Sequence, residues 1–228
     1  MTKNIHSGFD LSAEDYKILY RRFLDRSPRH LFEAAFMRRG DLVLDLCAGS
    51  MGRASIQALK MGAKSVAAVD LDPHVKELKK VDSRIVPYNY SVNDFLTMQS
   101  SSAFDQRFPF FNMAICQQGI NYWFSKANIR MLSRVLRKYG VFVFNTFNEM
   151  PDKRVTHREY VIGRRSYMEV YQLVGDVVHH AQFVDGLAPH YTTFDWIPRK
   201  AFEETLRAYF DNVVVTPDGA TDIYRCIK

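Results

Sequence analysis

The stretch LVLDLCAGSMG, residues 42–52, decides the fold that this sequence predicts. Its first three residues are apolar and indicate a short buried strand, with Asp45 standing near the carboxyl end. Gly49 and Gly52 then allow a sharp turn into a helical pattern that starts near Arg53. Such a turn brings backbone N–H groups and one carboxylate close to a ligand, at a point where a Cβ atom would obstruct. We therefore expect a ligand site at the end of this strand.

Short apolar runs alternate with amphipathic helical patterns from Asp41 to Asn145. Strands are expected at residues 42–46, 65–70, 84–88, 111–116 and 140–145. Helices are expected at residues 53–61, 73–80 and 125–138. The segment from Ser91 to Arg107 has weak signals. This alternation is typical of βαβ units and predicts a mostly parallel sheet with helices on both faces.

The pattern changes after Asn145. Residues 158–196 are rich in Tyr, Val, Phe and His, and turn signals occur at Gly175-Asp176 and Asp185-Gly186. An antiparallel meander of three or four strands is expected there. The chain then closes with a predicted helix at residues 198–209 and strands at 212–216 and 222–227, which Pro217-Asp218-Gly219 separates.

The stretch at residues 42–52 resembles motif I of the class I S-adenosylmethionine (SAM)-dependent methyltransferases. The family pattern is acid-x-Gly-x-Gly-x-Gly. Here Cys47 replaces the first glycine, Met51 replaces the third, Gly49 keeps the central place and Gly52 falls one residue late. No frame supplies the Gly-x-Gly-x-x-Gly of dinucleotide folds.

The resemblance implies a Rossmann-like α/β fold: a seven-stranded, mostly parallel sheet with helices on both faces and an antiparallel last strand. The meander is then an insertion after the fifth strand. We expect a single domain over residues 1–228. Its parts would be an N-terminal helical lid (1–38), a SAM-binding core (39–150 and 198–228) and a β-rich substrate cap (151–197).

The resemblance also implies SAM as the cofactor and places its parts. The methionine end would lie at Asp45, Cys47, Ala48 and Gly49. Asp70, about twenty residues beyond the glycine turn, would accept both ribose hydroxyls, with Leu71 beside it. Asp72 would cap the helix that begins at Pro73.

Two further segments match the family in type and order. Asn93, Asp94 and Phe95 would meet the adenine, although an exposed N-cap and a core phenylalanine explain the same residues. Gln117 or Gln118, at the end of the fourth strand, would lie beside the reactive methyl group. Trp123 is expected in the core, and the Cys116 thiol is expected to be buried.

Methyl transfer requires alignment more than acid–base help, so a general base is optional. His179, His180 and His190 are the candidates, because the pKa of histidine suits the task. His179 and His180 are adjacent on a predicted strand and therefore point to opposite faces. Each histidine is also explained as an edge-strand or surface residue.

The acceptor is expected to be a small molecule. Asn121, Tyr122, Tyr171 and, from the N-terminal helix, Tyr16 and Tyr20 are the candidate contacts. Tyr167, Glu169, Tyr171 and Leu173 alternate along one predicted strand and form one face. This face is equally suited to pack on the sheet or to form a homodimer.

Residues 11–37 indicate two helices joined at Ser27-Pro28, with Ser27 as the N-cap and Pro28 at the first helical position.

The 228 residues carry a net charge of +6, but the basic residues fall on scattered helix faces. Nucleic acid is therefore not favoured as a partner, though it stays open. No apolar run suits a membrane span, and no signal peptide is visible. The three cysteines lack metal-ligand spacing, so we expect reduced thiols, a cytoplasmic location and no metal.

The sequence therefore predicts a SAM-dependent methyltransferase that acts on an oxygen or nitrogen of a small molecule. The alternatives are a tRNA or protein methyltransferase and a SAM-binding protein without transferase activity. The Asn/Asp-Pro-Pro-aromatic motif of enzymes that methylate nucleic-acid amino groups is absent, because the corresponding residues are Cys116-Gln117-Gln118-Gly119.

Overall fold

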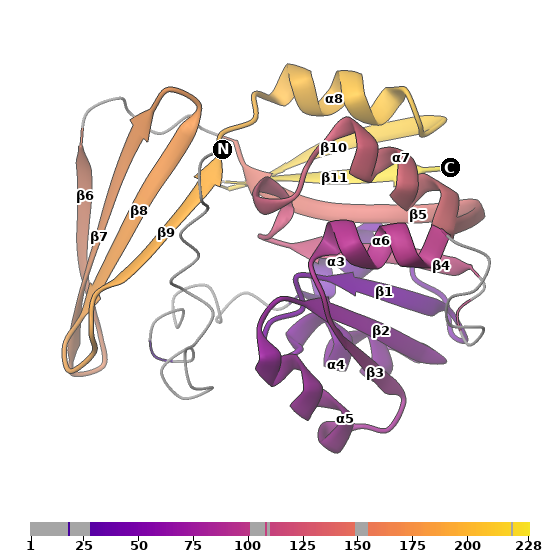
Figure 1. The fold of residues 1–228 in the computed structure, drawn as a ribbon, viewed down its shortest axis with the longest axis horizontal. Coiled ribbons are helices and arrows are strands. Elements are labelled where there is room, and N and C mark those ends of the chain that lie inside the picture. Colours follow the sequence, from indigo (N-terminus) through magenta and orange to yellow (C-terminus); the bar gives the residue numbers. More distant parts are fainter. Residues whose placement is uncertain (1–17, 19–27, 101–107, 109, 149–154, 220) are drawn as a thin grey trace. The chain divides into compact units, whose positions relative to one another are not determined.

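The computed structural model describes residues 18, 28–100, 108, 110–148, 155–219 and 221–228. The chain divides into two compact units, each described here by itself (Figure 1). One unit comprises Pro28–Asn148 and Pro198–Lys228, and the other comprises Met1–Ser27 and Glu149–Ile197. The expected single domain with a lid and a cap stays a prediction.

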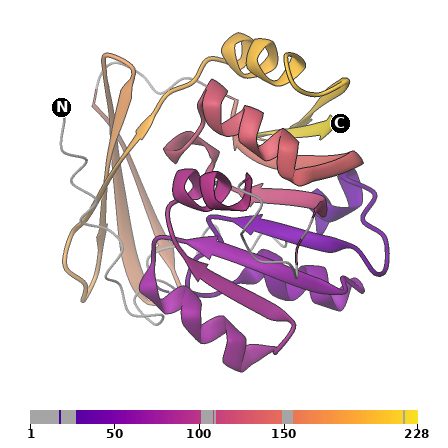
Figure 2. The same cartoon turned by 45° about the vertical axis from the view of Figure 1, so that its right-hand side comes forward.

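The larger unit is built on a seven-stranded sheet in the order β10-β11-β5-β4-β1-β2-β3 (Figures 1 and 2). The strands are β1 (Leu42–Leu46), β2 (Ser65–Asp70), β3 (Ile85–Asn89), β4 (Phe111–Gln117), β5 (Leu136–Phe147), β10 (Asn212–Asp218) and β11 (Thr221–Ile227). The five strands from β1 to β5 pair in parallel, and β11 runs antiparallel to both of its neighbours. The predicted fold class is confirmed.

The helical segments agree with the sequence prediction in most places. They are α3 (Arg29–Ala34), α4 (Arg53–Lys60), η1 (Pro73–Glu77), α5 (Leu78–Val81), α6 (Val92–Ser100), η2 (Ile120–Tyr122), α7 (Lys126–Val135) and α8 (Arg199–Arg207). Where Ser91–Arg107 had weak signals, α6 forms. The predicted helix 73–80 is a 3₁₀ turn followed by one α-helical turn.

Several predicted boundaries were wrong, among them those of the strand expected at residues 140–145, which spans Leu136–Phe147. The helix expected to reach residue 138 ends at Val135, because Leu136 is extended and pairs with Phe111 of β4. Pro217 and Asp218 belong to β10, so the final turn is tighter than expected. The helix expected to end at residue 37 stops at Ala34 and begins at Arg29, one residue after Pro28. Ser27, Tyr16 and Tyr20 lie outside the described residues.

Each face of the larger sheet is covered by helices. On one face, Leu31 and Phe32 of α3 and Ala58 of α4 pack on Val43 and Val143 of the strands. The other face carries an aromatic cluster between β5, β11, α8 and their neighbours: Trp123, Phe124, Phe142, Phe144, Phe202, Phe210 and Tyr224. Buried strands of this kind read as continuous apolar runs, which is why they were recognisable in the sequence.

Phe144 lies at the centre of this aromatic cluster. Its ring centroid is 4.9 Å from that of Phe142, 4.7 Å from that of Tyr224 and 5.7 Å from that of Phe202. The side chain is fully buried. If the Phe144 ring is removed, the stacked aromatic neighbours cannot move enough to fill the cavity that it leaves. We therefore expect truncation of Phe144 to lower stability strongly.

Phe144→Ala should lower the free energy of unfolding by about 3–5 kcal/mol, since it removes a buried ring and leaves a cavity. Urea unfolding of the purified variant measures the change. Phe110→Ala is the matched control, because Phe110 is 56% exposed and should change stability by less than about 0.5 kcal/mol. Equal losses in the two variants would contradict the role given to the cluster.

The smaller unit holds a four-stranded antiparallel sheet in the order β6-β7-β8-β9. Its strands are β6 (Thr156–Ile162), β7 (Arg165–Val174), β8 (Val177–Val184) and β9 (His190–Asp195). The predicted meander is therefore confirmed. On β7, Tyr167, Glu169 and Leu173 are buried, while the alternate residues are exposed or half-buried.

The described helices include none that is both long and apolar enough to cross a membrane.

Candidate functional site

The carboxyl ends of β1 and β4 lie side by side at the point where the strand order reverses. From β1 the chain moves outward to β2 and β3, and then returns to β4 on the other side of β1. In open α/β sheets, ligands bind in the crevice that forms at such a reversal. The candidate site is therefore at the ends of β1, β2 and β4 (Figure 2).

The turn after β1 has the left-handed backbone that the glycine pattern predicted. Gly49 and Gly52 have φ values of 65° and 52°, and a Cβ at Gly52 would lie 2.6 Å from the Leu78 side chain. Cys47 has φ of 59°, a conformation that costs a side-chain-bearing residue roughly 1–2 kcal/mol. Cys47 thus stands where the family pattern has its first glycine, in the conformation for which glycine is usual. Strain of this kind is commonly found at functional sites.

Asp70 connects the end of β2 to the glycine turn. One carboxylate oxygen accepts from the Gly49 N–H at 2.8 Å, and the other accepts from the Asp72 N–H at 2.8 Å. Burial raises the pKa of Asp70, although these backbone hydrogen bonds oppose the change. Asp72 accepts from the His74 N–H and caps η1, as predicted. Leu71, between the two acids, is exposed.

Asp45 is the second buried carboxyl group of the site. The Ser55 hydroxyl donates to it at 2.6 Å, and the group is almost fully shielded from solvent. Burial raises the pKa of Asp45 to about 7, and the neighbouring Asp70 charge adds to this effect. In the unfolded chain the pKa is near the ordinary value of 3.8. Sequence reasoning missed Ser55, because its contact depends on the turn geometry.

Asp45→Asn should stabilise the protein more as the pH rises. Between pH 4 and pH 7 the unfolded chain loses the Asp45 proton and the folded chain keeps it, so wild-type stability falls with rising pH. The asparagine can still accept from Ser55 and carries no charge. The stability gap between variant and wild type should widen by roughly 3 kcal/mol from pH 5 to pH 8.

Urea unfolding at the two pH values measures this gap. Asp211→Asn, which makes the same change at an exposed position, should show a difference that does not depend on pH. A gap for Asp45→Asn that stays constant with pH would refute the buried ionisation.

Ser50 is the one polar side chain of the turn that is buried without a hydrogen-bond partner among the described residues. Ser50 as a whole is only 8% exposed. An unsatisfied buried hydroxyl costs free energy, which makes Ser50 a candidate hydrogen-bonding group of the site. The sequence offered no signal for Ser50, since any residue can occupy that place in the motif.

Polar groups from β4 and β5 meet on the other side of the crevice. Gln118 has φ of 60°, and its N–H donates to the Asn145 amide oxygen at 3.0 Å. The Thr146 hydroxyl donates to the Asn121 amide oxygen at 2.8 Å. Gln117 ends β4 and is half-buried. Asn145 and Thr146 were not singled out from sequence, although two polar residues at the end of an apolar strand are a usable signal.

Cys47 fills the space between the two strand ends. Its sulfur lies 3.8 Å from the Gly119 carbonyl oxygen, and a hydrogen bond with the buried Cys116 thiol raises the pKa of Cys47. A Cβ on Gly119 would lie 2.5 Å from the Cys47 Cβ and 2.8 Å from its sulfur. Gly119 is thus required by the cysteine, since its own φ is ordinary. Tyr122, further along, is 43% exposed.

Gly119→Ala should lower the free energy of unfolding by about 1–3 kcal/mol, because the new methyl group overlaps Cys47. The double variant Cys47→Gly, Gly119→Ala removes the overlap and should regain most of the loss. Thermal unfolding of the two single variants and the double variant gives the coupling. Additive losses would contradict a direct clash.

Trp123 and Cys116 are buried, as expected.

The segment that was expected to meet the adenine forms the start of α6. The Ser91 hydroxyl accepts from the Asp94 N–H and donates to the Asp94 carboxylate, which is a reciprocal cap of α6. Asn93 and Asp94 are exposed, and Phe95 is fully buried against Tyr88. The capping residue is therefore Ser91 and not Asn93 or Asp94, whereas Phe95 has the expected core role. An adenine contact by this segment stays a prediction.

The three histidines differ in their surroundings. His179 and His180 point to opposite faces of β8, as predicted: His179 is exposed and His180 is buried. His190, at the start of β9, is also buried. The edge-strand or surface explanation was therefore wrong for His180, which is buried on the central strand β8, while His190 lies on the edge strand β9, as that explanation expects. Burial lowers the pKa of His180 to about 4 and lowers that of His190, so both rings are neutral at pH 7.

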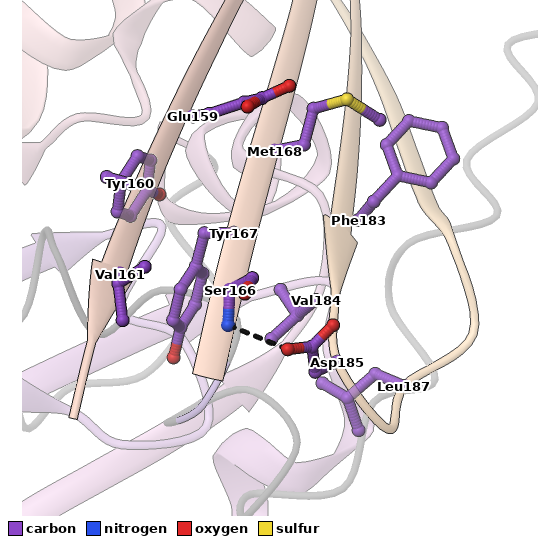
Figure 3. A pocket seen from close by; sticks show the side chains of 10 residues that line it. All are labelled: Glu159, Tyr160, Val161, Ser166, Tyr167, Met168, Phe183, Val184, Asp185 and Leu187. Carbon is purple, nitrogen blue, oxygen red and sulfur yellow. Dashed lines mark hydrogen bonds between the residues drawn. The ribbon is translucent and has the colours of Figure 1, made fainter. Parts of the chain in front are cut away.

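The smaller unit contains a cavity of about 410 Å³ beside the β7–β8 pair (Figure 3). The Ser166 N–H donates to the Asp185 carboxylate at its rim. The lining is mainly aromatic and aliphatic: Glu159, Tyr160, Val161, Ser166, Tyr167, Met168, Phe183, Val184, Asp185 and Leu187. A cavity of this size suits a small organic molecule.

No group of three or more metal-binding side chains comes together within the part of the chain that the structure describes.

No protein-family model matches this chain, and no curated protein matches its sequence. Solved structures do match. The SAM-bound structure of CalS10, an amino pentose methyltransferase from Micromonospora echinaspora, is similar with a TM-score of 0.70 and 13% identity, over 96% of this chain and 98% of that chain. A SAM-dependent methyltransferase from Clostridium acetobutylicum has a TM-score of 0.60 and 15% identity, over 96% and 92%.

A third similar structure is the glycopeptide N-methyltransferase MtfA in complex with SAM. Its TM-score is 0.56 and its identity 18%, over 88% of this chain and 92% of that chain. The chain therefore has the fold of the class I SAM-dependent methyltransferases, as the resemblance at residues 42–52 implied.

Proposed function

We propose that this protein is a SAM-dependent methyltransferase that transfers a methyl group to an oxygen or nitrogen of a small molecule. The observation that carries the proposal is the Asp70 carboxylate, which stands at the end of β2 and is hydrogen-bonded to the glycine turn after β1. The likeness to small-molecule methyltransferases in fold supports it.

The residues at the strand ends fit the parts of SAM. Each Asp70 oxygen accepts one backbone hydrogen bond and keeps a second lone pair, so the carboxylate can accept from two ribose hydroxyls. The unpartnered Ser50 hydroxyl and the backbone of Cys47, Ala48 and Gly49 suit the amino-acid end. Asp45 adds a buried carboxyl group beside the same turn.

The other predicted contacts complete the proposed site. Leu71 is exposed beside Asp70, and Asn93 and Asp94 are accessible for the adenine. Gln117 and Gln118 end the strand that borders the reversal of strand order.

When bound, SAM supplies a methyl group on a positively charged sulfur, which a nucleophile takes in an in-line displacement that leaves a neutral thioether. The protein's part is to hold the nucleophile in line with that carbon, within about 3 Å. The Asp70 carboxylate, when ionised, gives the crevice a negative local potential, which favours a cationic ligand over a neutral one.

Each unit, taken by itself, offers proposed acceptor contacts. Asn121 and Tyr122 follow β4 directly, and Tyr171 lies on the buried face of the four-stranded sheet. Residues 151–197 act as the substrate cap in this proposal. Tyr16 and Tyr20 lie outside the described residues.

One of His179, His180 and His190 is proposed to take a proton from the nucleophile. A neutral imidazole has one acceptor nitrogen, and burial keeps the rings of His180 and His190 neutral at pH 7. Full turnover by all three single alanine variants with the true acceptor would remove this role.

Asp70→Asn should weaken SAM binding at least tenfold, because the amide replaces charge-assisted hydrogen bonds worth about 1.5–3 kcal/mol each. Isothermal titration calorimetry with SAM and with S-adenosylhomocysteine measures the loss. Asp211→Asn is the control with the same charge change at an exposed position, and it should bind as the wild type does.

Absence of SAM binding by the wild-type protein would refute the proposed function. If SAM binds, transfer of a labelled methyl group to metabolite, RNA and protein mixtures separates the alternatives. Label in RNA or protein alone would replace the small-molecule acceptor, and label in none would leave a SAM-binding protein.

A further inference from the structure

Cross-strand pairing defines a second face of the four-stranded sheet, opposite to the face that holds Glu169. Residues alternate between the two faces along each strand, and residues directly opposite each other on neighbouring strands share a face. Met168 is the partner of Glu159 on β6 and of Phe183 on β8, so these three side chains form one row. We call the surface that they lie on the Met168 face.

The next row on the Met168 face consists of Val161, Ser166 and Asp185. Val161 and Ser166 are cross-strand partners, and the Asp185 N–H donates to the Ser166 carbonyl oxygen. Serine is the smallest residue of the row, and it stands between the other two. Space is therefore left at the centre of the row.

The cavity of about 410 Å³ lies between these two rows, and all six of their side chains line it (Figure 3). The intervening row also lines the cavity: Tyr160, Tyr167 and Val184. Because its side chains alternate onto the opposite face, we assign its main chain to the cavity floor. The cavity thus belongs to the Met168 face.

Met168 and Phe183 give the cavity an apolar wall. Both side chains are half-buried, and the Phe183 ring packs edge-to-face on Tyr191 of β9, with centroids 6.3 Å apart. A thioether and an aromatic ring are polarisable surfaces, which attract cations and other rings. Val161, Val174 and Tyr191, on the same face, are each more than half exposed. Apolar side chains gathered on one exposed face are typical of a binding surface.

The charges of the cavity are all of one sign. Its described lining residues include two acids, Glu159 and Asp185, and no lysine or arginine. Arg165, which is close in the chain, donates to the Asp185 carbonyl oxygen at 3.1 Å and not to the carboxylate. The whole chain carries a net charge of +6, so this cavity differs from the protein around it. Two carboxylates beside an apolar wall attract a cation and repel an anion.

Glu159 is the carboxylate that is available to a ligand. It makes no hydrogen bond and no ion pair within the part of the chain that the structure describes. The Asp185 carboxylate, by contrast, accepts from the Ser166 N–H at 2.9 Å. Figure 3 shows the Glu159 side chain extending towards Met168. A glutamate on an edge strand can serve only to face water, but here the same row adds a thioether and a ring. An apolar wall with one charged group beside it is the usual form of a small-molecule site.

We propose that the cavity of the Met168 face binds an organic cation, with the charge beside Glu159 and an aromatic or aliphatic body against Met168 and Phe183. The inference concerns the smaller unit alone. It goes beyond the proposed function, because it requires neither SAM nor methyl transfer.

Three probes of similar size test the class of ligand: 2-phenylethylammonium, 2-phenylethanol and phenylacetate. The full chain is labelled with ¹³C in its methionine methyl groups, and each probe is titrated by NMR at pH 7.5. Loss of one resonance in Met168→Leu identifies the Met168 methyl group. The cation should shift this resonance to saturation and bind at least tenfold more tightly than the alcohol, and phenylacetate should leave it unchanged.

Glu159→Gln keeps the shape of the side chain and loses its charge. It should weaken binding of the cation at least fivefold and leave binding of the alcohol as it is in the wild type. Asp176→Asn is the matched control, because it removes a carboxylate from an exposed turn of the same sheet. It should keep the wild-type affinity for the cation.

Ser166→Leu is the second variant, since it fills the space between the two rows. Ser166 is exposed, and its hydrogen bond to Asp185 comes from the main chain, so the variant should keep the wild-type unfolding temperature. It should abolish the shift that the cation causes.

Four results would each overturn the inference: no saturable shift of Met168 with any probe, equal binding of cation and alcohol, a preference for phenylacetate, and unchanged affinity for the cation in Glu159→Gln. Full binding by Ser166→Leu would overturn it too, because the cation would then lie elsewhere. Calorimetry with SAM on the same samples tests the proposed function separately. Loss of the cation preference refutes only the inference, and absence of SAM binding refutes only the proposed function.

Discussion

The hydrogen bond from the Gly49 N–H to the Asp70 carboxylate is the contact on which the candidate cofactor site depends. It joins the turn after β1 to the end of β2, two points that are 21 residues apart in the chain. Asp70 is buried, so the bond forms where water does not compete for it. Together with the hydrogen bond from the Ala48 N–H to the Val69 carbonyl oxygen, it fixes the left-handed turn that begins at Cys47 to the neighbouring strand at two successive residues.

The carboxyl edge of the sheet carries several features that cost stability. Cys47 and Gln118 hold left-handed backbone conformations, Asp45 is buried with a raised pKa, and the Ser50 hydroxyl is unsatisfied within the described residues. Such features persist when the surrounding structure enforces them. Here the aromatic cluster around Phe144 and the aliphatic face beneath α3 and α4 supply that support. Stability and binding capacity are thus located in different layers of the same unit.

The two units use buried carboxylates in different ways. Asp70 is held by backbone N–H groups, so its geometry follows from the path of the chain. Glu169 is held by the hydroxyls of Tyr160 and Tyr171, and its neighbour Gln182 keeps a free acceptor. The first arrangement suits a fixed ligand common to many proteins of one fold. The second is set by side chains alone.

Local sequence determined the strands, the glycine turn and the cap at Asp72, because apolar runs, left-handed turns and helix caps depend on residues close in the chain. The core role of Phe95 was also readable there, whereas α6 and its cap by Ser91 were not predicted. Only the tertiary structure decided the surroundings of Ser50 and Asn145 and the burial of Glu169. Their partners, or the lack of them, come from strands that are distant in sequence and meet through register and burial, which no local pattern records.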